Sequence, residues 1–205
     1  MARSHTFEDD CAAFSKFVAP RYCGTPFPAY RFIPGRNPHP TADPKGHSYQ
    51  APGSPSESIS LVLPAEWARS IDYLYGCDLY NHAYWWEAHE AWEGLWQLTD
   101  KAGIQGRFLQ GLIQASACHL KRFVGHARGV ERLRRTSLGY LRPVVEKTTG
   151  ATYMGLDLAA FIRDFEAYYH TSGARSDTIL DHDSRAYPYL RLDCLGPYPP
   201  ISQSQ

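Results

Sequence analysis

The stretch YNHAYWWEAHEAWEGLW at residues 80–96 decides the fold, because its aromatic residues recur at the spacing of an α-helix. At about 100° per residue, one side of this helix gathers indole, imidazole and carboxylate groups. The residues on that side are His82, Trp85, Trp86, His89, Trp92, Glu93 and Trp96. Glu87 and Gly94 are expected to point away. An aromatic side this wide is expected to be buried, so the stretch predicts a helix packed in a protein core.

Apolar residues at helical spacing predict further helices around this one. The expected ranges are 64–80, 83–98, 105–124 and 126–142, with a fifth helix that has Asp157 as its N-cap. The fourth is expected to stop before Pro143, since proline cannot continue the backbone hydrogen bonds. Short connections favour antiparallel neighbours. The sequence therefore predicts an all-α bundle of about four or five helices.

The two ends of the chain are expected to differ from this bundle. Residues 1–63 are predicted to hold a short helix over 7–18 and then a long arm, because most of the 15 prolines lie before residue 65. Residues 64–172 are predicted to form the helical domain. Residues 173–205 are predicted to form an extended tail that packs in part on the helices.

Composition excludes several classes of protein. The chain has 205 residues, with 21 Lys and Arg against 21 Asp and Glu, which argues against a disordered polyelectrolyte and against a histone-like nucleic-acid coat. Nucleic acid is therefore not favoured as a partner. The basic residues between Lys121 and Arg135 are expected to form a solvated helix face. No P-loop, dinucleotide-binding G-x-G-x-x-G or G-x-S-x-G motif supports an NTPase, a Rossmann oxidoreductase or an α/β-hydrolase.

Location and assembly follow from similar observations. The five cysteines are scattered and form no C-x-x-C pair, so a disulfide framework and a thiolate zinc knuckle are not favoured. No stretch has the apolar length of a signal peptide or a membrane span, so no membrane partner is expected. We therefore expect a cytoplasmic protein. A homo-oligomer is compatible with the sequence.

His89 and Glu93 form the candidate site. They stand at i and i+4 on the aromatic side, close enough to hydrogen-bond each other or to chelate one cation. A buried ionisable group is costly unless it is paired or bound to a metal. The pair can therefore be a satisfied structural network, a metal site or a metal-free acid–base pair. Glu90 lies about 100° round the helix from His89, which argues against a zinc protease built on H-E-x-x-E.

Two blocks of sequence resemble the DUF309 family of uncharacterised helical proteins. They are YNHAYWWEAHEAWEGLW, with H-x-x-x-E-x-x-W at His89, Glu93 and Trp96, and FLQGLIQASACHLK at 108–121. The resemblance covers about residues 71–142, and residues 30–49 resemble an N-terminal extension of longer bacterial members. It implies an all-α bundle and a metal-binding role for the His and Glu of the pattern, without a known substrate. Gln110, Gly111 and Gln114 match the second block.

These observations lead to one functional prediction and one alternative. The prediction is a protein that binds a divalent ion, zinc or similar, through His89 and Glu93, with hydrolysis by metal-bound water as its simplest chemistry. Further ligands are expected from His39 or His47 in the arm, or from His119. Trp92 and Trp96 are expected to wall the pocket, and Asp43, Gln110 and Gln114 to support it. The alternative is a non-catalytic interaction or structural module with a buried His–Glu pair.

Overall fold

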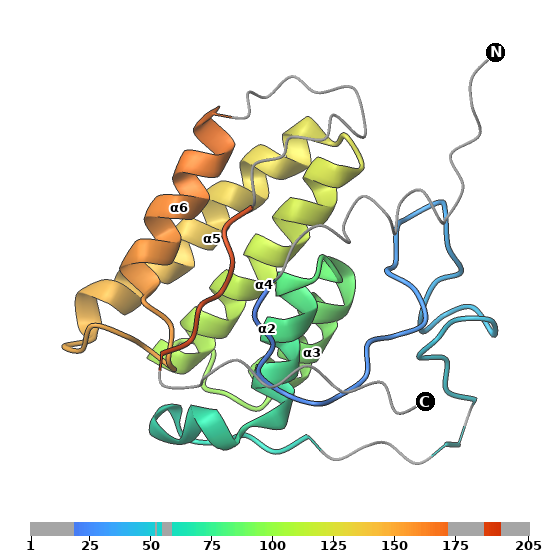
Figure 1. Cartoon of the computed structure of the whole chain (residues 1–205), viewed down its shortest axis with the longest axis horizontal. Helices are drawn as coiled ribbons and strands as arrows, with labels where there is room; N and C mark the ends of the chain where they lie inside the picture. The colour runs from blue at the N-terminus through green and yellow to red at the C-terminus, as the bar shows by residue number, and fades with distance from the viewer. Residues whose placement is uncertain (1–18, 52, 55–58, 172–186, 194–205) are drawn as a thin grey trace.

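The computed structural model describes residues 19–51, 53–54, 59–171 and 187–193 (Figure 1). Within these ranges the protein is all-α, with five α-helices and a short 3₁₀ helix, and no described residue belongs to a β-strand. This confirms the predicted fold class. The helix expected over residues 7–18 lies outside the described residues.

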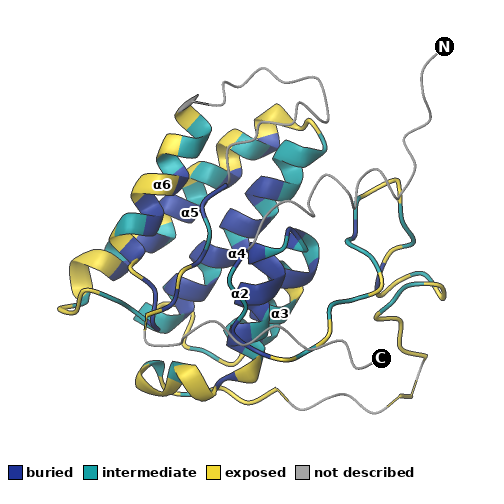
Figure 2. Ribbon diagram, in the orientation of Figure 1, coloured by how far each residue is buried: buried dark blue, intermediate teal, exposed yellow. Residues whose placement is uncertain are grey.

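The helices pack as a bundle around α4. The elements are η1 (Pro64–Arg69), α2 (Ile71–Asn81), α3 (Trp85–Gln97), α4 (Ile104–Phe123), α5 (Ala127–Lys147) and α6 (Leu158–Thr171). Helix α4 contacts both α3 and α5, while α2 packs on α3 and α6 packs on α5 (Figure 1). The buried residues concentrate where these helices meet (Figure 2). No helix in the described part of the chain has the length and apolar character needed to cross a lipid bilayer.

The single helix expected over residues 64–80 is in fact two elements, which corrects the prediction. Ser70 interrupts it with an extended backbone (φ −83°, ψ 97°), and its side chain accepts a hydrogen bond from the N–H of Tyr73 at 3.3 Å. A serine hydroxyl in this position satisfies a free N–H at the start of a helix. Ser70 therefore ends η1 and begins α2.

Helix α5 continues past Pro143 to Lys147, so the predicted end before this proline is wrong. Pro143 has no N–H to donate to the carbonyl of Gly139, and its ring crowds that carbonyl. Gly139 is exposed, so its carbonyl can bond to water in place of the missing N–H. Leu141 and Val144 are fully buried on either side of the proline and hold the helix in the bundle.

Two buried polar residues of α2 anchor the segments at both ends of the described chain. The carboxylate of Asp78 accepts hydrogen bonds from the N–H groups of Tyr22 (2.6 Å) and Cys23 (3.1 Å). The side chain of Asn81 donates to the carbonyl of Leu190 (2.9 Å) and accepts from the N–H of the same residue (2.8 Å). Residues 187–193 therefore lie as an extended strap across the helices (Figure 1), and the rest of the predicted tail over 173–205 lies outside the described residues.

Candidate metal centre

Helix α3 turns a different side to the core from the one that the sequence suggested. Its buried large side chains include Trp85, Trp92 and Leu95, and this side is rotated by roughly 80° from the direction of His89. His89 and Glu93 therefore lie at the edge of the core, with 28% and 39% of their side chains exposed. The expectation that this pair is buried among indole rings is wrong.

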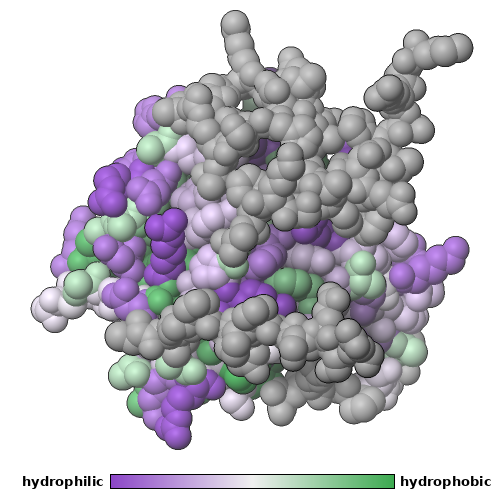
Figure 3. Space-filling model, viewed as in Figure 1, coloured by the Kyte–Doolittle hydropathy of each residue, from purple (hydrophilic) through white to green (hydrophobic). Residues whose placement is uncertain are grey.

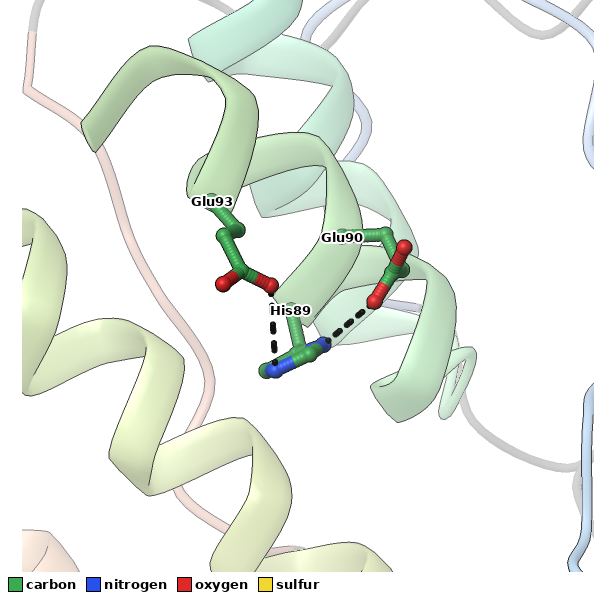
Figure 4. A group of neighbouring side chains, drawn as sticks. All are labelled: His89, Glu90 and Glu93. Atoms are coloured by element: carbon green, nitrogen blue, oxygen red, sulfur yellow. Dashed lines mark ion pairs between the residues drawn. The ribbon is translucent and has the colours of Figure 1, made fainter. Parts of the chain in front are cut away.

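His89 lies between two carboxylates of its own helix (Figure 4). Its Nδ1 is 3.1 Å from Oε1 of Glu90, and its Nε2 is 3.6 Å from Oε2 of Glu93. One ligand atom from each of the three residues lies within 4.8 Å of the others, which makes this group the candidate ion site of the described residues. Glu90 is absent from the predicted ligand set, because the Cα–Cβ direction at this position points about 100° away from that of His89. The glutamate side chain is long enough to reach back to the imidazole.

Two nitrogen atoms near this group have no hydrogen-bond partner. Nδ1 of His89 is buried and unpartnered, because its approach to Glu90 lacks hydrogen-bond geometry. Nε1 of Trp96, one turn after Glu93, is also buried without a partner. Nζ of Lys101 lies 4.4 Å from the centre of the Trp96 ring. An unpaired buried polar atom is costly, and no hydrogen bond within the described residues offsets this cost for Nδ1 of His89 or Nε1 of Trp96.

Trp92 belongs to the core and not to the edge of the site. It is fully buried, and its Nε1 donates to the carbonyl of Tyr73 at 3.4 Å. Gly76 of α2 lies directly against the indole, where a Cβ would collide with it. The indole therefore holds α2 and α3 together, which differs from the expected role as a pocket wall.

The arm crosses α3 on the side opposite His89. His47 meets Glu87, with Nε2 3.0 Å from Oε1, and the two side chains are only 6% and 5% exposed. Glu87, which the helical spacing had placed on the outside, is thus a buried carboxylate. Its direction on α3 is about 160° from that of His89, so His47 does not approach the candidate ion site.

Glu87 ties the arm to the bundle. Its Oε1 also accepts a hydrogen bond from the N–H of Phe32 at 2.8 Å, while its Oε2 is buried without a partner. Burial raises the pKa of this carboxyl group, and the hydrogen bonds from His47 and Phe32 act in the opposite direction. The described residues do contain a buried His–Glu pair, but it joins His47 to Glu87 and not the predicted His89 to Glu93.

The other polar residues of the arm stabilise its turns. Nδ1 of His39 accepts from the N–H groups of Thr41 (3.4 Å) and Ala42 (3.3 Å). The carboxylate of Asp43 accepts from the N–H of Lys45 at 2.9 Å. Neither residue belongs to the group formed by His89, Glu90 and Glu93.

His119 lies in a separate buried network. Its Nε2 is 2.7 Å from the hydroxyl of Tyr80, and its Nδ1 is 2.9 Å from the hydroxyl of Tyr169. Burial lowers its pKa to about 3, so the imidazole is neutral near pH 7. Because both ring nitrogens are engaged, His119 connects α2, α4 and α6 and is not placed with His89. Neither Tyr80 nor Tyr169 was predicted from the sequence as a partner of His119.

The two glutamines of α4 differ in their contacts. Gln114 accepts a hydrogen bond from the hydroxyl of Thr136 at 3.0 Å, which links α4 to α5. Gln110 is half-buried on the same side of α4, one turn earlier. Gly111 lies against Leu141 of α5, so it permits the close packing of these two helices.

The comparison with known families matches part of this bundle. Residues 73–133 form a DUF309 domain, which is described as a domain of unknown function. This range includes α2 from Tyr73, all of α3 and α4, and the first turns of α5. No significant match was found among curated proteins or among solved structures.

Proposed function

We propose that this protein binds a divalent metal ion through His89, Glu90 and Glu93 of its DUF309 domain. The observation that supports the proposal is the placement of one imidazole nitrogen and two carboxylate oxygens within 4.8 Å of one another. A bound cation would also give the buried Nδ1 of His89 the partner that it lacks.

The chemistry of the three ligands suits ions such as Zn²⁺, Mn²⁺ and Fe²⁺. Imidazole favours the borderline transition metals, and carboxylates also accept the harder ions. All three ligands come from consecutive turns of one helix, so they occupy one side of the ion. Sites with three protein ligands keep positions for water or substrate, as catalytic zinc sites do.

We infer that the reaction, if the site is catalytic, is a hydrolysis. A divalent ion in such a site supplies a nucleophilic water near neutral pH. Trp96 would border the substrate position on the C-terminal side, because helical side chains lean toward the preceding turn. Lys101, which lies over the Trp96 ring, would add a positive charge at this border. Both residues would bind and orient the substrate.

Metal binding can be measured directly on protein purified without a histidine tag. Elemental analysis and calorimetric titration with Zn²⁺ and with Mn²⁺ should show about one ion per chain. Replacing a residue that only supports a ligand typically costs 10- to 100-fold in affinity, so His89→Ala should cost about a hundredfold or more. The variant Glu90→Gln/Glu93→Gln should have a similar effect.

Matched controls separate the site from general surface binding. His170 and Glu146 are exposed residues far along the chain from α3, so His170→Ala and Glu146→Gln should leave the affinity unchanged. Wild-type protein that takes up no ion after reconstitution would contradict the proposal. That result would favour the alternative, a non-catalytic module in which the His47–Glu87 pair fixes the arm.

The cytoplasm is the location that we propose. Cys23, Cys77 and Cys118 are free thiols, and all of them are buried. Free cysteines are typical of a reducing compartment.

A further inference from the structure

Helix α5 carries a row of exposed arginines without acidic partners. Arg128, Arg132 and Arg135 follow one another at spacings of four and three residues, which places them on one side of the helix. All three are exposed, and no carboxylate of the described residues forms an ion pair with any of them. Figure 3 shows hydrophilic side chains over α6, which lies in front of α5 in this view.

The nearby acidic residues are already occupied. The carboxylate of Glu131 receives hydrogen bonds from Arg134, with nitrogen–oxygen distances of 3.1 and 3.2 Å. Glu166 of α6 pairs with Arg142 at 2.6 Å. The positive charge of the three arginines is therefore not neutralised by their helical neighbours.

This arrangement is electrostatically unfavourable for the helix itself. Like charges at i, i+3 and i, i+4 weaken a helix. Arg128 also lies in the first turn of α5, which contains no acidic residue, although the helix dipole favours negative charge there. Within the described residues no carboxylate offsets these two costs by pairing with Arg128, Arg132 or Arg135, and this points to a partner outside the described bundle.

The neutral composition did not favour nucleic acid as a partner and predicted a solvated basic face, but for the unpaired row on α5 we propose that Arg128, Arg132 and Arg135 bind the phosphate backbone of nucleic acid. The guanidinium group matches phosphate oxygens with two parallel hydrogen bonds. The row extends over about 10 Å at a rise of 1.5 Å per residue, which is comparable to about three base-pair steps of 3.4 Å along the axis of a duplex. The exposed Gly139 continues the same side of the helix without a side chain, so a strand can approach the backbone there.

An anionic membrane fits this surface less well. Membrane-bound helices combine basic residues with large apolar side chains that enter the lipid. Among the described residues of α5, the large apolar side chain that is exposed is Val145 in the last turn, and it lies beyond the arginine row. The other exposed apolar residues belong to segments before α4. The surface therefore fits a polyanion that binds through charge alone.

The test measures fluorescence anisotropy of a labelled 20-base-pair DNA duplex and of a 20-nucleotide single strand with the full chain. For the duplex, three phosphate contacts give a slope of about −2.7 in log K against log salt, so affinity should fall roughly fortyfold from 50 to 200 mM salt. Arg132→Glu/Arg135→Glu should abolish binding, and Arg132→Gln/Arg135→Gln should reduce the slope by about one for each arginine. Circular dichroism should show that the helices remain.

A matched double variant provides the control. Arg69→Glu/Arg163→Glu changes the net charge by the same amount at exposed arginines of η1 and α6, and it should bind almost as well as the wild type. Equal losses in both double variants would overturn the proposal, as would the absence of binding to either strand form at 50 mM salt. Tighter binding to polyglutamate, or to vesicles with 30% phosphatidylserine, would also overturn it.

Discussion

Replacing Glu87 by alanine should release the N-terminal arm from the bundle. The substitution removes the acceptor for the N–H of Phe32 and for His47, in a site where both carboxylate and imidazole are more than nine-tenths buried. A hydrogen bond to a charged group contributes about 1.5–3 kcal/mol, and loss of one partner of a buried ion pair costs about 3–5 kcal/mol. We therefore expect the free energy of arm opening to fall by about 3 kcal/mol.

Limited trypsin digestion measures this opening, because Arg36 and Lys45 lie within the arm. When cleavage is slow compared with closing, its rate follows the population of the open form, so 3 kcal/mol corresponds to roughly a hundredfold faster cleavage. Helix content by circular dichroism should change little. Glu90→Ala, three residues later on the exposed side of α3, is the control and should cleave at the wild-type rate. Equal cleavage rates for the two variants would refute the assignment of Glu87 as the tether.

Two further predictions concern the core. Gly111→Ala should lower the free energy of unfolding by about 1–3 kcal/mol in urea denaturation, since its Cβ would collide with Leu141, whereas Gly139→Ala should raise it by up to about 1 kcal/mol because nothing lies near that Cβ. The pKa of His119 is lowered from its ordinary 6.5 to about 3 in the folded protein. Between these two pH values the imidazole is protonated in the unfolded chain and neutral in the folded chain. The free energy of unfolding should therefore fall by up to about 1.4 kcal/mol for each pH unit as the pH is lowered from 6.5 to 3. His119→Gln should remove this contribution, and an unchanged pH profile of the variant would contradict the assignment.

The helices were predictable where local spacing decides them. The apolar pattern gave 105–124 for α4, which the structure has at Ile104–Phe123. The break at Ser70 and the continuation past Pro143 were missed for a common reason. Each depends on whether the surrounding structure satisfies one backbone group, and helical periodicity carries no information about that.

In the candidate site, too, the contacts within one helix were predictable and the contacts between distant segments were not. Helical spacing brought His89 and Glu93 together correctly, because residues at i and i+4 always lie near each other. It could not show which side of α3 the arm covers, so it places Glu87 on the surface and pairs His47 with the carboxylate of Glu93, whereas His47 meets Glu87. The partners of His119 are 39 and 50 residues away in the chain, beyond any local pattern.

Helix α2 anchors residues 22–23 through Asp78 and Leu190 through Asn81, and both of these segments lie outside the range that matches the family model. The segment that matches the family model, 73–133, contains Asp78 and Asn81. It contains none of the groups that their side chains bind, and it stops within α5. Excised alone, it would place a carboxylate and an amide at an apolar interface stripped of its covering. The range that matches the family model is thus smaller than the set of segments that pack together in the structure, and residues 19–23 and 187–193 belong to the larger set.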